Sequence, residues 1–100
     1  MGLLVEYSLK EGQAEAQEAA LKTFVAGLKA EGVDGFSYSS FATDDPTKFI
    51  GLFLFDDEAG KQRFLNSAAF AAYRDGAGPR FTGPPSTTAI RPVASTFDQD

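Results

Sequence analysis

Cysteine, histidine and tryptophan are all missing from this chain of 100 residues. Without cysteine there can be no disulfide, no thiolate metal site and no cysteine nucleophile. Without histidine the chain lacks the commonest general base and the commonest ligand of transition metals. No imidazole is available to activate a serine or threonine hydroxyl. We therefore expect neither a metal site nor a cofactor.

Long apolar runs and an excess of positive charge are missing as well. No run approaches the roughly 20 residues that a membrane span needs. The first residues, Met1–Glu6, include no basic region of the kind that begins a secretory signal, so we expect a cytoplasmic protein. A net charge of −5 excludes nucleic-acid binding by bulk electrostatics.

The charge is distributed unevenly along the chain. Residues 1–60 carry −7 and residues 61–100 carry +2. We interpret the acidic half as a solvated surface. The alternative is that the arginines of the second half gather around an anionic or polar ligand, and these are Arg63, Arg74, Arg80 and Arg91.

Hydrophobic periodicity predicts a single domain, residues 1–100, in the order β-α-β-β-α-β. This order is typical of the ferredoxin-like α+β fold, in which both helices pack on one face of an antiparallel four-stranded sheet. The expected strands are Leu3–Leu9, Gly35–Ala42, Phe49–Phe55 and Thr87–Ala94, the expected helices are Gln13–Glu31 and Glu58–Asp75 (broken near Asn66 and Ser67), and the expected loop and loose tail are Gly76–Ser86 and Ser95–Asp100.

The first predicted helix contains two features that bear on its packing. Ala16, Ala20, Phe24 and Leu28 follow one another at four-residue steps, which predicts that they face the sheet. Gly27 is costly inside a helix, so we interpret it as a point of close approach between helix and sheet, or equally as a tolerated glycine.

The strand predicted at Phe49–Phe55 is apolar on both faces. Helices on one face of the sheet cannot cover the other, and a half-solvated strand should alternate with polar residues. An exposed apolar patch of this kind is an association site or an aggregation hazard. We therefore predict a homodimer through the sheet face that buries Ile50, Leu52 and Leu54; the alternative is a monomer whose loops fold over the sheet.

Four segments carry a family resemblance: Leu3–Gly12, Glu31–Phe36, Phe49–Asp57 and Asn66–Phe70. Their order and spacing over residues 3–94 resemble the antibiotic biosynthesis monooxygenase-like domains of the dimeric α+β barrel superfamily. The resemblance implies a dimeric α+β barrel. It also implies one of several activities, which include cofactor-independent oxygenation of polycyclic aromatic or quinol substrates and degradation of haem.

The resemblance also separates these two activities. Haem-degrading members place asparagine on the first strand, tryptophan on the third strand and histidine on the second helix, where this chain has Val5, Phe55 and Arg74. Ligation of haem iron by a proximal imidazole is impossible without histidine. We therefore expect no haem degradation, whereas oxygenation of an aromatic substrate needs no metal.

A pocket between sheet and helices is the expected binding site, because the resemblance places Val5 and Phe55 at pocket positions. An apolar cleft with a few polar tips suits a small aromatic ligand, and hydroxyl and guanidinium groups could stabilise a substrate phenolate. No catalytic residue is identified. The predicted substrate-binding residues are Tyr7, Phe24, Phe53, Phe55, Phe70, Tyr73 and Arg74.

Two functions stay open at this point. The first is a cofactor-independent monooxygenase acting on a small aromatic or quinone-type substrate. The second is a non-catalytic homodimer that binds a small apolar ligand or has no ligand at all. We favour the simpler interpretation that the ten phenylalanines fill the core. An enclosed cavity beneath Phe24, Phe55 and Tyr73 would favour a ligand site, and a packed core there would exclude one.

Overall fold

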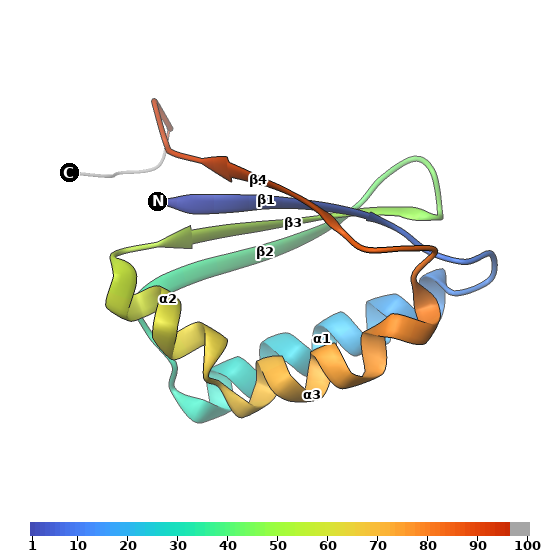
Figure 1. Cartoon of the computed structure of the whole chain (residues 1–100), viewed down its shortest axis with the longest axis horizontal. Helices are drawn as coiled ribbons and strands as arrows, with labels where there is room; N and C mark the ends of the chain where they lie inside the picture. The colour runs from blue at the N-terminus through green and yellow to red at the C-terminus, as the bar shows by residue number, and fades with distance from the viewer. Residues whose placement is uncertain (97–100) are drawn as a thin grey trace.

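The computed structural model describes residues 1–96, in which four strands and three α-helices alternate along the chain (Figure 1). The strands pair antiparallel throughout, in the order β2-β3-β1-β4. The predicted ferredoxin-like order is thus confirmed, with the second helix divided in two. The elements are β1 Gly2–Ser8, α1 Ala14–Glu31, β2 Phe36–Ala42, β3 Lys48–Phe55, α2 Glu58–Leu65, α3 Ala68–Ala77, a 3-10 turn η1 at Gly78–Arg80, and β4 Ser86–Ile90.

The division between α2 and α3 lies at Asn66 and Ser67, as predicted. Ser67 is buried, and its Oγ donates to the Phe64 carbonyl at 2.8 Å and accepts from the Phe70 amide at 3.2 Å. The hydroxyl therefore binds the end of one helix and caps the start of the next. Asp57 caps α2 in the same way, accepting from the Gly60 amide at 2.8 Å.

The buried face of α1 is rotated from the predicted one. Gln17, Leu21, Phe24 and Leu28 are buried, whereas Ala16 is exposed. Strict four-residue steps drift by about 40° per step around a helix of 3.6 residues per turn, so the real stripe alternates steps of four and three. The helix ends at Gly32, whose φ of 68° is left-handed, as glycine at this position allows.

Gly27 does mark a close approach, but to a helix and not to the sheet. A Cβ atom at Gly27 would lie 3.0 Å from the Cβ of Ala69 on α3. The expectation of a helix–sheet contact is therefore wrong. A glycine opposite an alanine lets α1 and α3 pack closely along their length.

The C-terminal part of the prediction needs two corrections. α3 continues through Ala77 into η1, so the expected loop at Gly76–Ser86 begins later. β4 is an edge strand, as predicted, but it ends at Ile90, because Pro92 has no amide to continue the ladder. Most of the expected tail Ser95–Asp100 lies outside the described residues.

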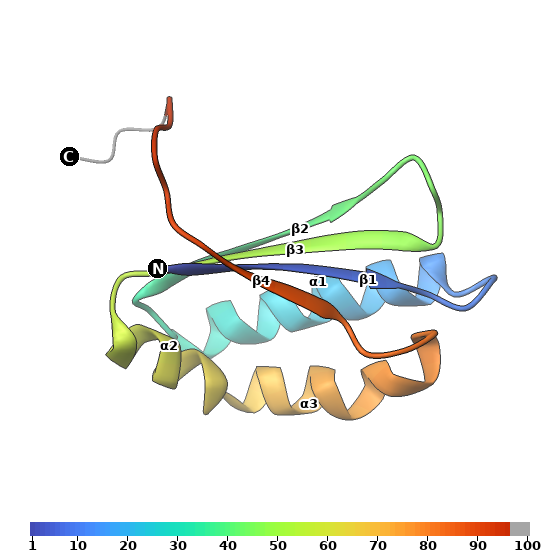
Figure 2. The ribbon, with the colours of Figure 1, turned by 45° about the horizontal axis from the view of Figure 1, so that its top comes forward.

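All three helices lie on one face of the sheet, and the other face is open (Figures 1 and 2). On the open face Ile50, Leu52 and Leu54 are half-buried, and Leu52 is paired with Leu4 across β1. Phe41, on the neighbouring β2, is 50% exposed. The predicted apolar face therefore exists, and none of the described helices folds over it.

None of the helices in residues 1–96 combines the length and the hydrophobicity that crossing a membrane requires.

Candidate functional site

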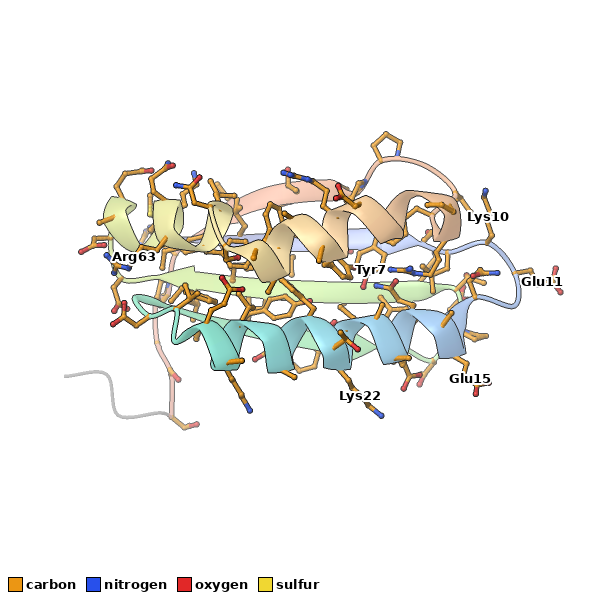
Figure 3. All side chains as sticks on the ribbon, turned by 90° about the horizontal axis from the view of Figure 1, so that it is seen from below. Tyr7, Lys10, Glu11, Glu15, Lys22 and Arg63 are labelled. Carbon is orange, nitrogen blue, oxygen red and sulfur yellow. The ribbon has the colours of Figure 1, made fainter. Side chains whose placement is uncertain are left out.

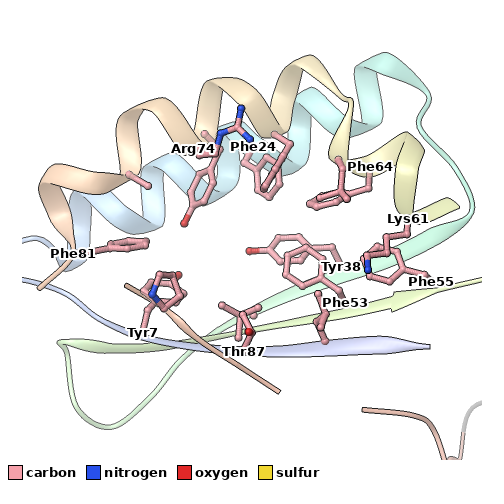
Figure 4. Close-up of a pocket in the computed structure, with 18 of the residues that line it drawn as sticks. Tyr7, Phe24, Tyr38, Phe53, Phe55, Lys61, Phe64, Arg74, Phe81 and Thr87 are labelled. Atoms are coloured by element: carbon pink, nitrogen blue, oxygen red, sulfur yellow. The ribbon is translucent and has the colours of Figure 1, made fainter. Parts of the chain in front are cut away.

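A cavity of about 420 Å³ lies between the helix layer and the sheet (Figure 4). Tyr7 and Phe81 lie at one end of it, Phe55 and Lys61 at the other, and Arg74 and Thr87 on opposite sides. Its lining is mostly apolar. The lining residues are Leu3, Val5, Tyr7, Phe24, Tyr38, Gly51, Phe53, Phe55, Lys61, Phe64, Leu65, Phe70, Tyr73, Arg74, Ala77, Gly78, Phe81, Pro85 and Thr87.

The floor of the cavity follows from strand alternation. β1 and β3 present every second side chain to the helices, which places Val5 opposite Gly51 at the centre of the sheet. A Cβ atom on Gly51 would meet Tyr38, Phe53 and Val5 only at 3.5–3.8 Å, which is ordinary van der Waals contact. The missing side chain therefore leaves free space above the sheet at this point.

One end of the cavity is built of phenylalanine rings. Phe64 of α2 lies with its ring centroid 5.1 Å from Phe53 and 4.9 Å from Phe70. Phe24 of α1 stacks on Tyr73 of α3 at 4.8 Å and meets Tyr38 edge-on at 5.3 Å. These stacked and edge-to-face arrangements are the favourable ones for aromatic pairs, and they offer flat apolar walls to a ring-shaped ligand.

The other end holds a buried polar network. The amide nitrogen of Gln17, a residue with 0% exposure, donates to the Tyr7 hydroxyl at 2.8 Å and to the Tyr73 hydroxyl at 2.7 Å. The amide oxygen of Gln17 accepts from Nε of Arg80 at 2.8 Å. The network joins β1, α1, α3 and η1 at one point, so the hydroxyl positions depend on all four elements.

Arg80 is held in place by the end of α3. Its Nη1 donates to the Gly76 carbonyl at 2.7 Å, while Nη2 is buried without a hydrogen-bond partner in residues 1–96. The salt bridge found in the same residues joins Arg63 to Asp34, so no carboxylate neutralises Arg80 there. The tyrosine end of the cavity therefore lies beside an unneutralised positive charge.

Burial keeps the cavity tyrosines protonated. The pKa of Tyr7 is raised above its ordinary value, first by burial and then by the neighbouring Tyr73. Burial likewise raises the pKa of Tyr38 to about 12. Desolvation disfavours the phenolate in both residues, so their hydroxyls are neutral hydrogen-bonding groups at physiological pH.

Cationic side chains lie at the edge of the cavity. Lys61 of α2 is half-buried, and the exposed Arg74 of α3 places its guanidinium carbon 5.2 Å from the centroid of Phe70. This cation–π contact holds Arg74 against the aromatic wall. Neither carboxylates nor imidazoles occur among the lining residues.

All seven predicted substrate-binding residues line this one cavity, namely Tyr7, Phe24, Phe53, Phe55, Phe70, Tyr73 and Arg74. Their role in binding a ligand stays a prediction. The four arginines do not form the cluster considered above, because Arg74 alone of them lines the cavity and Arg63 pairs with Asp34. In residues 1–96 no three acidic side chains come together as a metal site would require.

Sequence analysis missed Gln17 and the inward direction of Arg80. A signal for Gln17 was available: it lies one helical step before Leu21 on the buried stripe, at a position where an apolar residue is expected. Tyr38 and Phe64 were also missed as lining residues, although their strand and helix faces follow the same periodicities.

Comparisons with known proteins agree with this architecture. The sequence model of the family described as antibiotic biosynthesis monooxygenase matches residues 1–76. No protein with a curated function matches the sequence.

Solved structures resemble the chain over nearly its whole length. A protein of unknown function from Nitrosomonas europaea is 25% identical with a TM-score of 0.80, and the match covers 99% of this chain and 94% of that one. Rv0793 from Mycobacterium tuberculosis is 18% identical with a TM-score of 0.80, covering 96% and 97%. A candidate antibiotic biosynthesis monooxygenase from Caulobacter crescentus is 18% identical with a TM-score of 0.81, covering 93% and 89%.

Proposed function

Since the chain belongs to the antibiotic biosynthesis monooxygenase family, we propose that it is a cofactor-independent monooxygenase of a small aromatic or quinol substrate. The observation that carries the proposal is the cavity of about 420 Å³, with aromatic walls at one end and tyrosine hydroxyls beside Arg80 at the other. A planar substrate would lie between the walls with its oxygen toward the hydroxyls.

The proposed reaction uses the substrate as its own reductant. A hydroquinone loses a phenolic proton, and the electron-rich phenolate reduces dioxygen. One oxygen atom forms a bond to a ring carbon, that carbon loses its hydrogen, and the other oxygen atom leaves as water. A hydroquinone and one dioxygen thus give a hydroxyquinone and one water, with no external electron donor.

The cavity supports this reaction by stabilising the ionised substrate. Since no carboxylate or imidazole lines the cavity, a protein base of the usual kind is missing there. Neutral tyrosine donors and the charge of Arg80 lower the pKa of a bound phenol, because they stabilise the phenolate more than the phenol. The rate should therefore rise with pH as the substrate ionises.

The same missing base favours the second candidate, a protein that binds a small apolar ligand without changing it. The two candidates make different predictions for one experiment. Oxygen consumption is measured with a series of hydroquinones, and products are analysed by mass spectrometry after reaction under heavy-isotope dioxygen. Consumption above the buffer rate with labelled product supports the monooxygenase; tight binding without consumption supports the binding protein and contradicts the enzyme.

Variants show whether any activity belongs to this cavity. Gly51→Val should fill the floor and abolish both binding and turnover, because the new side chain would project into the cavity. Tyr73→Phe and Arg74→Ala should lower turnover; unchanged rates in both would remove these residues from the mechanism. Ala19→Val, at an exposed position of α1, is the control.

We further propose that two copies pair through the open face of the sheet, with Ile50, Leu52 and Leu54 in the interface. The support is that these side chains lie on the face without helices (Figure 2). Burying each of them would contribute about 1.5–3 kcal/mol before entropic costs. Light scattering at micromolar concentration should give twice the chain mass, and Leu52→Glu should give monomer or aggregate.

The control for this experiment is Ala19→Glu, which adds the same charge on the helix side of the molecule. It should leave the mass at two chains. A wild-type protein with the mass of one chain would contradict the proposed pairing.

A further inference from the structure

Gln17 is a polar residue at a position where leucine would be the simpler choice. It is 0% exposed and belongs to the buried stripe of α1 with Leu21 and Phe24. A buried amide destabilises a protein unless its hydrogen bonds are made. Here all three polar contacts of the side chain are made, to Tyr7, Tyr73 and Arg80. The site is therefore specified in detail.

The orientation of the Gln17 amide follows from its partners. A guanidinium can only donate hydrogen bonds, so the group facing Nε of Arg80 must be the amide oxygen. The amide NH₂ then faces Tyr7 and Tyr73, 2.8 and 2.7 Å away, and donates to both. The oxygen–nitrogen ambiguity that usually affects glutamine is removed by chemistry.

This orientation decides what the two tyrosines can do. Each hydroxyl accepts a hydrogen bond from Gln17, so each still has its own proton to donate. The hydroxyls of Tyr7 and Tyr73 lie close enough for one to donate to the other, which uses one proton at most. No other acceptor for these protons is found in residues 1–96. At least one proton is therefore left for the cavity that both residues line.

We propose that Gln17, held by Arg80, is a positioning residue that turns Tyr7 and Tyr73 into hydrogen-bond donors toward the cavity, and so selects ligands that present an acceptor oxygen. Such ligands are quinones, ketones and ionised phenols. The inference rests on the proposed function only in taking this cavity as the binding site. It names the substrate oxygen that the site recognises, which a purely apolar cavity would not.

The arrangement differs from one made for an un-ionised phenol. A neutral phenol binds best to an acceptor, because its hydroxyl must donate its proton. The Gln17–Arg80 pair provides the opposite, a donor supported by a nearby positive charge. Bound phenols should therefore ionise more readily than free ones.

Matched ligands and one isosteric substitution test the inference. In Gln17→Glu the carboxylate accepts from both tyrosine hydroxyls and from Arg80, so the tyrosine protons turn away from the cavity. Isothermal titration calorimetry should show wild-type protein binding naphthoquinone about tenfold more tightly than naphthalene, the worth of one hydrogen bond. Gln17→Glu should lose this preference and keep its affinity for naphthalene.

A spectroscopic signature separates this role from a merely structural one. Ionised para-nitrophenol is coloured, so its absorbance gives the pKa of the bound phenol. That pKa should be lower than in solution for wild-type protein and raised in Gln17→Glu. Gln13→Glu, one turn earlier on the chain, introduces the same charge without the tyrosine partners and should behave as wild type. Tyr73→Phe, which removes one donor, tests the same point if Gln17→Glu does not fold.

The outcomes distinguish this inference from the monooxygenase proposal. An acceptor preference without oxygen consumption would contradict the enzyme and leave the role of Gln17 standing. Equal naphthoquinone preference and an equal phenol pKa in wild type and Gln17→Glu would overturn the inference, even if the protein oxidises quinols.

Discussion

The helices α1 and α3 are joined at both ends, but by different chemistry. At one end Glu31 of α1 accepts from the amides of Ala68 and Ala69 at 3.0 and 2.7 Å, in an exposed position. At the other end Gln17 of α1 accepts from Arg80, just past the end of α3, at 2.8 Å in a buried one. Figure 3 shows the two helices side by side over the sheet.

The difference indicates which end serves stability and which serves the site. A carboxylate at a helix N-terminus stabilises the helix without leaving water. A buried amide and a cation, in contrast, stabilise little compared with well-packed apolar side chains. The Glu31 end can therefore be explained by the fold alone, whereas the Gln17 end is explained by the tyrosine hydroxyls that it orients.

Core packing differs in the same direction, and Phe64→Ala should show the largest effect. Phe64 is 3% exposed, and its ring meets those of Phe24, Phe36, Phe53, Phe55 and Phe70 at 4.9–6.1 Å. Its removal should lower the free energy of unfolding by about 3–5 kcal/mol, measured by urea denaturation.

The matched control is Phe81→Ala at the tyrosine end. Phe81 is half-buried and stacks on Tyr7 at 4.7 Å, so fewer contacts are lost. Its cost should be clearly smaller. Equal losses at the two sites would mean that both ends are packed for stability alike.

Raising the pH should destabilise the fold through the buried tyrosines. Unfolded tyrosine ionises near pH 10, whereas burial raises the pKa of Tyr38 to about 12 and that of Tyr7 as well. Above about pH 10 the unfolded chain loses protons that the folded chain keeps, so stability falls as pH rises, by about 1.4 kcal/mol per pH unit for each tyrosine. Below this range these two residues contribute no pH dependence.

Urea denaturation at several alkaline pH values measures this slope. Tyr38→Phe should reduce it by the contribution of one tyrosine, while lysine ionisation affects both proteins alike. An unchanged slope in Tyr38→Phe would show that Tyr38 ionises normally in the folded state.

Much of the Glu31 end could be predicted from sequence, and little of the Gln17 end. Two-residue alternation identified the face of each strand, and Gly32 marked the end of α1. Alanines lie on all sides of α1, so hydrophobicity does not define its buried face, and a glutamine there resembles a surface residue. Arg80 points inward because of the η1 turn, whose geometry no periodicity reports.

Glu31→Gln should have a moderate effect at the exposed end. The side chain keeps its shape but loses its charge and one acceptor oxygen, so the cap on α3 weakens. We expect a loss of about 1 kcal/mol in the free energy of unfolding, with no change in ligand affinity. Glu18→Gln, an exposed glutamate of the same helix, is the control and should cost less. An equal cost in both would show that the Ala68 and Ala69 contacts do not stabilise the fold.

Asp34→Asn should have the smallest effect, although it removes the salt bridge found in residues 1–96. Arg63 and Asp34 lie 3.1 Å apart, but their side chains are 49% and 85% exposed. Solvent weakens such a pair, and holding two mobile side chains together costs entropy, so its loss should change the free energy of unfolding by about 0.5 kcal/mol or less. Arg63 also donates to the Asp34 carbonyl, a bond that asparagine preserves. A loss as large as that of Glu31→Gln, measured at low and at high salt, would mean that exposed charges stabilise this end by attraction in general. The comparison between the ends would then depend on charge and not on helix capping.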